Sequence, residues 1–247
     1  MDAALPIAAS TRALPGTRAV PEGLPPLDQL LRDREGLLSR IATLDDLTSF
    51  ARAMIVTIAA GAGVFGLVLG SYRGGIQILY AGLKLPLVVL LTAALTTPAL
   101  VATRAALGLS RGIQRDTALV LAALALGCLI LAALSPLAFL AILLGAPYHV
   151  VIMTAVGCCA AGGVIGLSVL YRGLRSRSLR ETALVALPAL GLFVAVGAQM
   201  TWSLRPYVLR PRTPSPPFVR SLEGSFLDSV WTSSRSARGI YDDEPGE

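Results

Sequence analysis

The sequence predicts an all-α membrane protein: a polytopic bundle of about five transmembrane helices, with an N-terminal amphipathic helix before it and a short C-terminal interfacial helix after it. Five long apolar runs lie between residues 54 and 203, and none has a charged residue in its middle. A run of about 18 or more apolar residues is long enough to cross a bilayer as a helix, which makes its backbone hydrogen bonds internally. The whole chain is 54% hydrophobic and 15% charged, whereas soluble domains carry about 25% charged residues.

Changes in composition divide the chain into successive segments. Residues 1–26 are rich in Ala, Pro, Ser, Thr and Gly and are predicted to be a disordered tail. We expect the amphipathic helix over residues 27–49 and the five-span membrane domain over residues 50–204. A proline-rich segment and the interfacial helix follow over residues 205–231, and residues 232–247 are predicted to be a second disordered tail.

The segment before the first span has apolar residues mostly every three or four positions, with charges of both signs between them. This spacing is typical of an amphipathic helix. Helices that lie on membrane surfaces are usually cationic, whereas the charges here are mixed. We therefore expect this helix to dock on the cytosolic end of the bundle or on a partner helix, through Leu30, Leu31, Leu37, Leu38 and Ile41.

Each apolar run sets the limits of one expected span. The five spans are expected over residues 54–70, 85–103, 117–134, 149–170 and 182–202. The third run stays apolar to residue 146, but Pro136 divides it, so we expect a bent or interfacial extension over residues 137–144. Pro86 is expected in the first turn of its span, where its missing N–H costs nothing.

The arginines of the short loops predict the orientation of the bundle. The loops after the second and fourth spans are rich in arginine, whereas the other side carries Arg73, Lys84 and a turn at residues 145–147 without basic residues. Arginine-rich short loops favour the cytoplasm. We therefore expect a multi-pass protein of a bacterial inner membrane, with its N-terminus in the cytoplasm and its C-terminus outside. The arginines at residues 205–212 favour the opposite side for the C-terminus and leave a miscounted span as the alternative.

Apolar residues recur every four positions again after the last span. Prolines between residues 205 and 217 forbid a continuous helix there. The following repeat predicts a short helix on the membrane surface, with its tryptophan at the depth of the headgroups. The residues expected to face the membrane or the bundle end are Phe218, Leu222, Phe226 and Trp231.

Small residues recur every four positions in the first and fourth spans. In lipid, small side chains let helix backbones approach closely. We therefore expect close helix contacts, within the chain or between copies of it, at Ala62, Gly66, Gly70, Cys158, Gly162 and Gly166.

The polar residues inside the spans are mostly uncharged. Threonine hydroxyls can donate hydrogen bonds to their own helix, and we expect this of Thr92, Thr96 and Thr97. The three cysteines lie within apolar runs, where they are expected to act as small apolar residues rather than in a disulfide.

No pattern in the chain predicts a catalytic site, a metal site or a cofactor. The only histidine, His149, lies at a span boundary without a neighbouring carboxylate, and the expected span interiors contain no ionisable group. Nucleophilic catalysis needs a base beside the nucleophile, and ion coupling needs charges within the membrane. Lys84 and Arg104 bracket the second span, and both are expected to reach the headgroups by snorkelling. The sequence thus predicts a protein that is not an enzyme and has no cofactor.

Two stretches carry a resemblance to known proteins. They are Gly-Ser-Tyr at residues 70–72 with Ala-Gly-Leu-Lys-Leu-Pro-Leu at 81–87, and Gly-Ala-Gln-Met-Thr-Trp-Ser-Leu-Arg-Pro-Tyr at 197–207 with Glu-Gly-Ser-Phe at 223–226. They resemble a group of uncharacterised bacterial multi-span proteins, some labelled as actin-binding after a WASP-homology motif. That group is similar in layout to the five-span Yip (Ypt-interacting protein) family. The resemblance implies a membrane-resident, non-enzymatic protein and assigns no active-site residues.

Two functions stay open. The first is a non-catalytic scaffold or accessory subunit of a membrane complex, in contact with membrane lipids and with a protein partner or a second copy of the chain. The alternative is a component of a transporter for lipid or a small apolar solute, in which prolines bend the spans around a cavity. The net charge of +6 is explained by arginines that flank the spans, and no basic stripe with interleaved aromatic residues predicts nucleic-acid binding.

Overall fold

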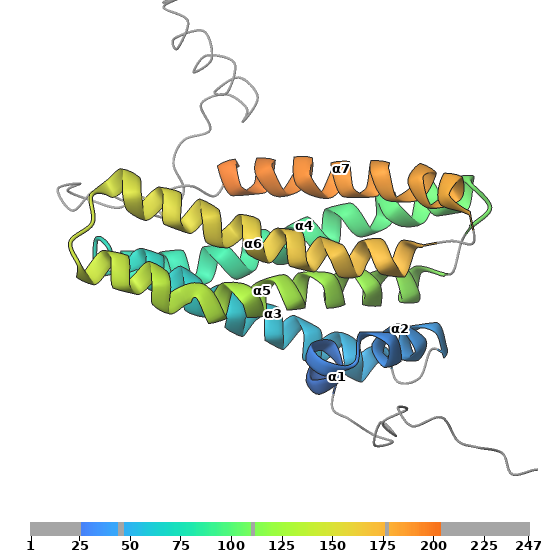
Figure 1. Ribbon diagram of the computed structural model, residues 1–247, viewed down its shortest axis with the longest axis horizontal. Coiled ribbons are helices and arrows are strands. Elements are labelled where there is room, and N and C mark those ends of the chain that lie inside the picture. The colour runs from blue at the N-terminus through green and yellow to red at the C-terminus, as the bar shows by residue number, and fades with distance from the viewer. Residues whose placement is uncertain (1–25, 44–46, 110–111, 176–177, 204–247) are drawn as a thin grey trace, which may run out of the picture.

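The computed structural model describes residues 26–43, 47–109, 112–175 and 178–203. Over these ranges the protein is all-α (Figure 1). Five of the helices are long and apolar enough to cross a membrane, so the prediction of a five-span helix bundle is confirmed. The helices are α1 (Pro26–Arg32), α2 (Arg34–Thr43), α3 (Leu47–Gly70), α4 (Gln77–Ala106), α5 (Ile113–Leu143), α6 (Tyr148–Leu174) and α7 (Leu179–Ser203).

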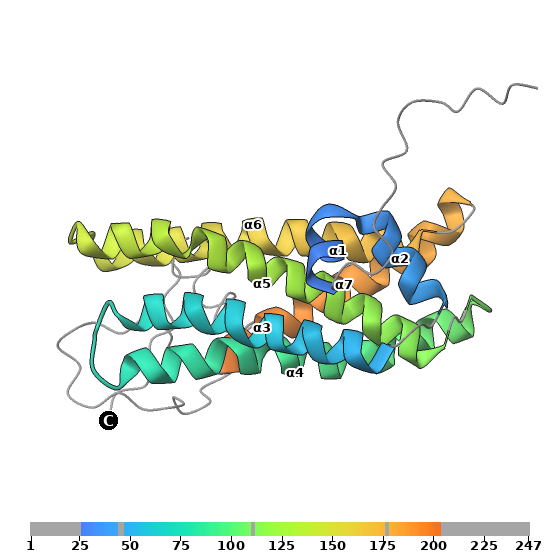
Figure 2. The same ribbon diagram turned by 90° about the horizontal axis from the view of Figure 1, so that it is seen from below.

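The two ends of the bundle differ in what they carry. The connections from α4 to α5 and from α6 to α7 lie at one end, and the turns from α3 to α4 and from α5 to α6 lie at the other (Figures 1 and 2). We call the first end the arginine end, after Arg104, Arg115, Arg172 and Arg175. Helices α1 and α2 lie beside the bundle in the half nearest this end. Helix α5 is the most central, because it contacts α1, α2, α3, α4 and α6.

The amphipathic segment forms two helices, so the prediction of one helix over residues 27–49 is wrong. The chain breaks at Asp33, whose Oδ1 accepts a hydrogen bond of 2.9 Å from the backbone N–H of Gly36 and so caps the start of α2. A β-carbon at position 36 would overlap this carboxylate, which would have to move from its capping position. Helix α3 begins at Leu47, and residues 44–46 lie outside the described part of the chain.

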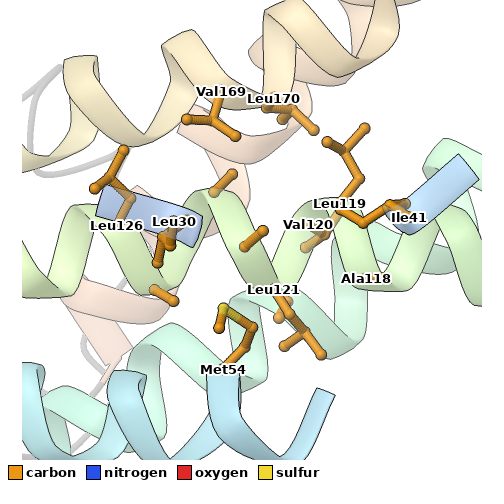
Figure 3. Packing of buried hydrophobic residues seen from close by; sticks show 14 of the residues in the cluster. Leu30, Ile41, Met54, Ala118, Leu119, Val120, Leu121, Leu126, Val169 and Leu170 are labelled. Atoms are coloured by element: carbon orange, nitrogen blue, oxygen red, sulfur yellow. The ribbon is translucent and has the colours of Figure 1, made fainter. Parts of the chain in front are cut away.

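The apolar side of these two helices packs on the bundle itself. Leu30, Leu37 and Ile41 are buried in one hydrophobic cluster with residues of α3, α5 and α6 (Figure 3). Leu38 packs at the edge of that cluster, whereas Leu31 is 50% exposed. Most of the apolar surface of the segment is therefore used within the chain. The predicted tails and the residues Phe218, Leu222, Phe226 and Trp231 lie outside the described residues.

The small residues of α3 lie against α4. A β-carbon at Gly66 would overlap the carbonyl of Ala81, and one at Gly70 would lie 2.6 Å from the carbonyl oxygen of Gln77. Ala62 is fully buried one turn earlier on α3. The backbones of α3 and α4 are therefore in direct contact, which a larger side chain at either glycine would prevent.

The small residues of α6 make the same kind of contact with α5. A β-carbon at Gly162 would lie 2.8 Å from the carbonyl oxygen of Gly127, and one at Gly166 would lie 2.6 Å from that of Ala123. Cys158, one turn earlier, is buried in a second hydrophobic cluster. In both pairs, the small residues face a helix of the same chain.

All five long helices extend beyond the spans that the sequence predicted, and α4 and α5 do so most. Helix α4 begins at Gln77, so Pro86 lies within the helix and not in its first turn. Helix α5 is continuous past Pro136, so the separate extension over residues 137–144 is wrong. Pro136 has no N–H to donate to the carbonyl of Ala132, but the Ser135 hydroxyl donates to that carbonyl at 2.7 Å. This bond satisfies the group that the proline leaves free and lets the helix continue through lipid.

The threonines of α4 follow the prediction. The hydroxyls of Thr92, Thr96 and Thr97 donate to the carbonyls four residues earlier, at 2.7 to 2.8 Å. Each hydroxyl is thus satisfied within its own helix. The cysteines are free thiols: Cys128 and Cys158 are buried, and Cys159 is exposed.

The contact between α3 and α4 predicts a position-specific cost for a single methyl group. We expect Gly66→Ala to lower stability by about 1–3 kcal/mol, the usual cost of overpacking. Gly63→Ala on the same helix is the control, since its β-carbon would meet Gly82 and Pro86 only at 3.6 and 3.8 Å. The midpoint of thermal unfolding in mild detergent measures both. Equal midpoints for the two variants would contradict the close contact.

The arrangement of the connections predicts which residues share a side of the membrane. In a chain whose three cysteines are replaced by alanine, a cysteine at Arg175 and one at Pro147 should react with a membrane-impermeant maleimide from opposite sides. Arg175 follows α6 at the arginine end, and Pro147 precedes α6 at the other. Arginine in short loops predicts the cytoplasmic side for position 175. Labelling of both from one side would rule out α6 as a span.

Candidate functional site

A cavity of about 280 Å³ lies between α4, α5, α6 and α7. It exists because α6 packs on α5 and α7 packs on α4, whereas α6 and α7 contact each other much less. We call this cavity the apolar cleft. Its lining includes Val88 and Thr92 of α4, Leu131 of α5, Leu170 of α6 and Phe193 of α7.

Glycines open the space of the apolar cleft. A β-carbon at Gly163 of α6 would meet no atom within 4 Å, and one at Gly197 of α7 would meet only a methyl carbon of Thr92, at 3.8 Å. Gly162, beside Gly163, is instead pressed against the backbone of α5. The small residues of α6 therefore have two roles. Those on one face allow close contact with α5, and those on the adjacent face leave space beside α7.

The apolar cleft opens on the outer surface of the bundle in the middle of the spans. Cys159, Gly163 and Val194 line it and are exposed, Val194 by 61%. In a membrane, this surface faces the hydrocarbon of the lipid. No charged residue lines the cleft among the described residues, and the Thr92 hydroxyl is already bonded to the carbonyl of Val88. The cleft is therefore suited to an apolar ligand.

The volume of the cleft sets the size of such a ligand. Small-molecule pockets in proteins usually measure about 300 to 1,000 Å³. At about 280 Å³, this cleft is near the lower limit of that range. It fits part of an acyl chain or a small apolar solute and is too small for a whole lipid.

A buried ion pair lies at the arginine end. Nη1 of Arg104, in the last turn of α4, is 3.3 Å from Oδ1 of Asp116, in the first turn of α5, and the side chains are 4% and 2% exposed. Nε and Nη2 of Arg104 donate to the carbonyl of Leu109, at 3.3 and 3.1 Å. The prediction that Arg104 snorkels is wrong, because its charge is held inside the protein by a carboxylate and a loop carbonyl.

Lys84 also departs from its prediction. It is fully buried about two turns into α4 and shares a face of that helix with Gln77, Ala81 and Val88, which are buried too. It was expected at the end of a span, with its amine among the headgroups. The earlier start of α4 places it within the membrane-spanning helix instead. The expectation that no ionisable group lies within a span is therefore wrong for Lys84.

Asp116 was missed because it was assigned to a loop. Its signal in the sequence is an acidic residue just before a long apolar run, with an arginine just before the same loop. An acidic residue is favoured in the first turn of a helix, so that position marks a helix start and not a loop. Once α5 is extended back to Ile113, Asp116 falls inside it and needs a cationic partner in the bundle.

Metal binding has no candidate cluster in the described part of the chain. No cluster of three His, Cys, Asp or Glu residues lies there. The side chain of His149 is outside the described residues. The absence of catalysis and of a cofactor stays a prediction from the sequence.

Comparison of the chain with protein-family models, with curated proteins and with solved structures found no match. No family is therefore identified, and the resemblance to the Yip family has no support from these comparisons.

The ion pair predicts a large effect when one charge is removed. Asp116→Leu should lower stability by about 3–5 kcal/mol, since it leaves a buried guanidinium without its carboxylate. The double variant Arg104→Met with Asp116→Leu should recover most of that loss, because no unpaired charge remains buried. Thermal unfolding in detergent compares them, with Arg52→Met, an exposed arginine on α3, as the control. A double variant as unstable as Asp116→Leu would contradict a stabilising role for the pairing.

Proposed function

We propose that this integral membrane protein is a non-catalytic lipid-handling component, which holds an acyl chain or a similar small apolar group in the apolar cleft between α6 and α7. The observation that carries the proposal is a cleft in mid-span, lined by apolar residues and open to the side where the lipid lies. Of the two functions left open by the sequence, the cleft favours the handling of a lipid or an apolar solute.

The arrangement of the helices supports binding from the side. Helices α3, α4, α5 and α6 are joined by extensive contacts, whereas α7 rests mainly on α4. A ligand that enters between α6 and α7 thus displaces few protein contacts. Apolar groups gain little from leaving lipid for another apolar environment, so affinity has to come from close van der Waals packing in the cleft.

A scaffold or accessory subunit is the second candidate. Leu27 and Leu31 on α1 favour it, because they lie one turn apart on one face of the helix and are 40% and 50% exposed. This pair fits the apolar face of a partner helix, or of a second copy of the chain. Affinity purification of the native protein with identification of its partners tests this candidate. A single-chain monomer at its native level in the membrane would count against it.

Filling the cleft tests the first candidate. Gly163→Phe should place its ring in the free space beside Gly163 without disturbing the contact with α5. In vesicles that contain a phospholipid with a photoreactive group on its acyl chain, the wild type should crosslink at α6 and α7 around the cleft, and the variant should lose most of that product. Gly157→Phe is the matched control, since Gly157 is also an exposed glycine of α6 with free space around it but does not line the cleft.

Two results would overturn the proposal. One is crosslinking spread evenly over all lipid-facing helices of the wild type. The other is an equal loss of crosslinking in Gly163→Phe and Gly157→Phe. Both variants should keep the wild-type free energy of unfolding within about 0.5 kcal/mol, as substitutions away from packed positions do.

A further inference from the structure

A second cavity, of about 380 Å³, lies at the arginine end. Its walls come from α2, α4, α5 and α6, with Arg175 contributed by the residue that follows α6. We call it the arginine cavity. Among the described residues, four arginines and one aspartate line it, and their formal charges sum to +3.

The positive charge of the arginine cavity is not neutralised by its own lining. Asp116 is its one carboxylate among the described residues, and it is engaged by Arg104. Three guanidinium groups remain, those of Arg115, Arg172 and Arg175. Arg172 and Arg175 are exposed at the rim, and Arg115 is half-buried. A concave site with a charge of one sign concentrates ions of the opposite sign.

Arg115 gives a more specific indication that the arginine cavity binds an anion. Its Nε is buried and has no hydrogen-bond partner among the described residues. A buried donor left unsatisfied destabilises a protein, so such groups are usually completed by a water or a ligand. Guanidinium groups have a fixed fork of N–H donors that matches phosphate and carboxylate oxygens.

The rest of the lining is apolar. Leu38, Ile41 and Leu119 form a wall beside the arginines. The cavity also lies where the apolar span of α6 gives way to Arg172 and Arg175, which is the depth of lipid headgroups in a spanning helix. A group held here is thus surrounded by cations and continues toward an apolar side, as the head of an amphiphile does.

We propose that the arginine cavity binds the phosphate group of an anionic membrane lipid. The chemistry shared with free phosphate is a compact anion with several acceptor oxygens. The depth of the cavity and its apolar wall favour the lipid as the source. This inference does not depend on the function proposed for the apolar cleft, because the two cavities share no lining residue.

The test compares three additives on the full-length protein in detergent. They are phosphatidylglycerol, zwitterionic phosphatidylcholine and inorganic phosphate, each titrated while the midpoint of thermal unfolding is followed. Phosphatidylglycerol should raise the midpoint of the wild type more than the other two, and the gain should shrink as salt is added, because salt screens exposed charges. Binding of phosphatidylglycerol to the double variant Arg172→Gln with Arg175→Gln should be at least about 10-fold weaker, as expected for the loss of two cations near an anionic headgroup.

The control is Arg180→Gln. Arg180 is an exposed arginine near the start of α7, at the same end of the bundle, and does not line the cavity. It should keep the wild-type affinity. The Gly163→Phe variant should also bind phosphatidylglycerol as the wild type does, which separates a failure of this inference from a failure of the cleft.

Three other results of this experiment would contradict the proposal. Equal effects of phosphatidylglycerol and phosphatidylcholine would overturn the proposal, as would an equal loss in Arg180→Gln and in the double variant. An effect of inorganic phosphate as large as that of phosphatidylglycerol would overturn the lipid as the source and leave a site for free phosphate.

Discussion

The fold depends on places where helix backbones touch, one of them between α3 and α5, where a β-carbon at Gly61 would lie 2.6 Å from the carbonyl oxygen of Cys128. Between α3 and α4 the contact is made at Gly66 and Gly70, and between α5 and α6 at Gly162 and Gly166. Lipid offers little hydrophobic drive for helices to associate, so dispersion contacts at short range must do most of the work. The glycines let the backbones approach to that distance. The contact between α3 and α5 then joins the two helix pairs into one bundle.

The fifth span takes no part in these contacts. Helix α7 rests mainly on α4, and Gly197 leaves space where a side chain would otherwise fill the gap to α6. The apolar cleft is therefore a consequence of unequal packing: four spans are drawn together, and the fifth is held from one side. A ligand site at a weakly packed helix fits a general pattern, because elements that open for ligands come from the less stable parts of a fold.

The parts of the fold predicted from the sequence are those with a long, local signal. The length of five apolar runs set the number of spans, and the four-residue spacing of Gly66 or Gly162 marked the faces at which helices meet. The boundaries were harder, because polar residues such as Gln77 and Asp116 belong to helices whose protein contacts cover them. The break at Asp33 depends on a single capping bond, which leaves the apolar period on both sides intact.

The apolar cleft could not be predicted from the sequence, for a different reason. The cleft exists because α6 and α7 do not pack closely on each other. No local sequence pattern predicts that two helices will fail to pack. The same holds for the arginine cavity: its arginines were visible as a loop bias, but only the fold gathers Arg115 and Arg172 from separate helices around one space.

The linings of the two cavities also lie close to each other along α6. Leu170 lines the apolar cleft and Gly173 the arginine cavity, and three residues of α-helix rise by about 4.5 Å. The linings of the two cavities therefore come within about one helical turn of each other along α6.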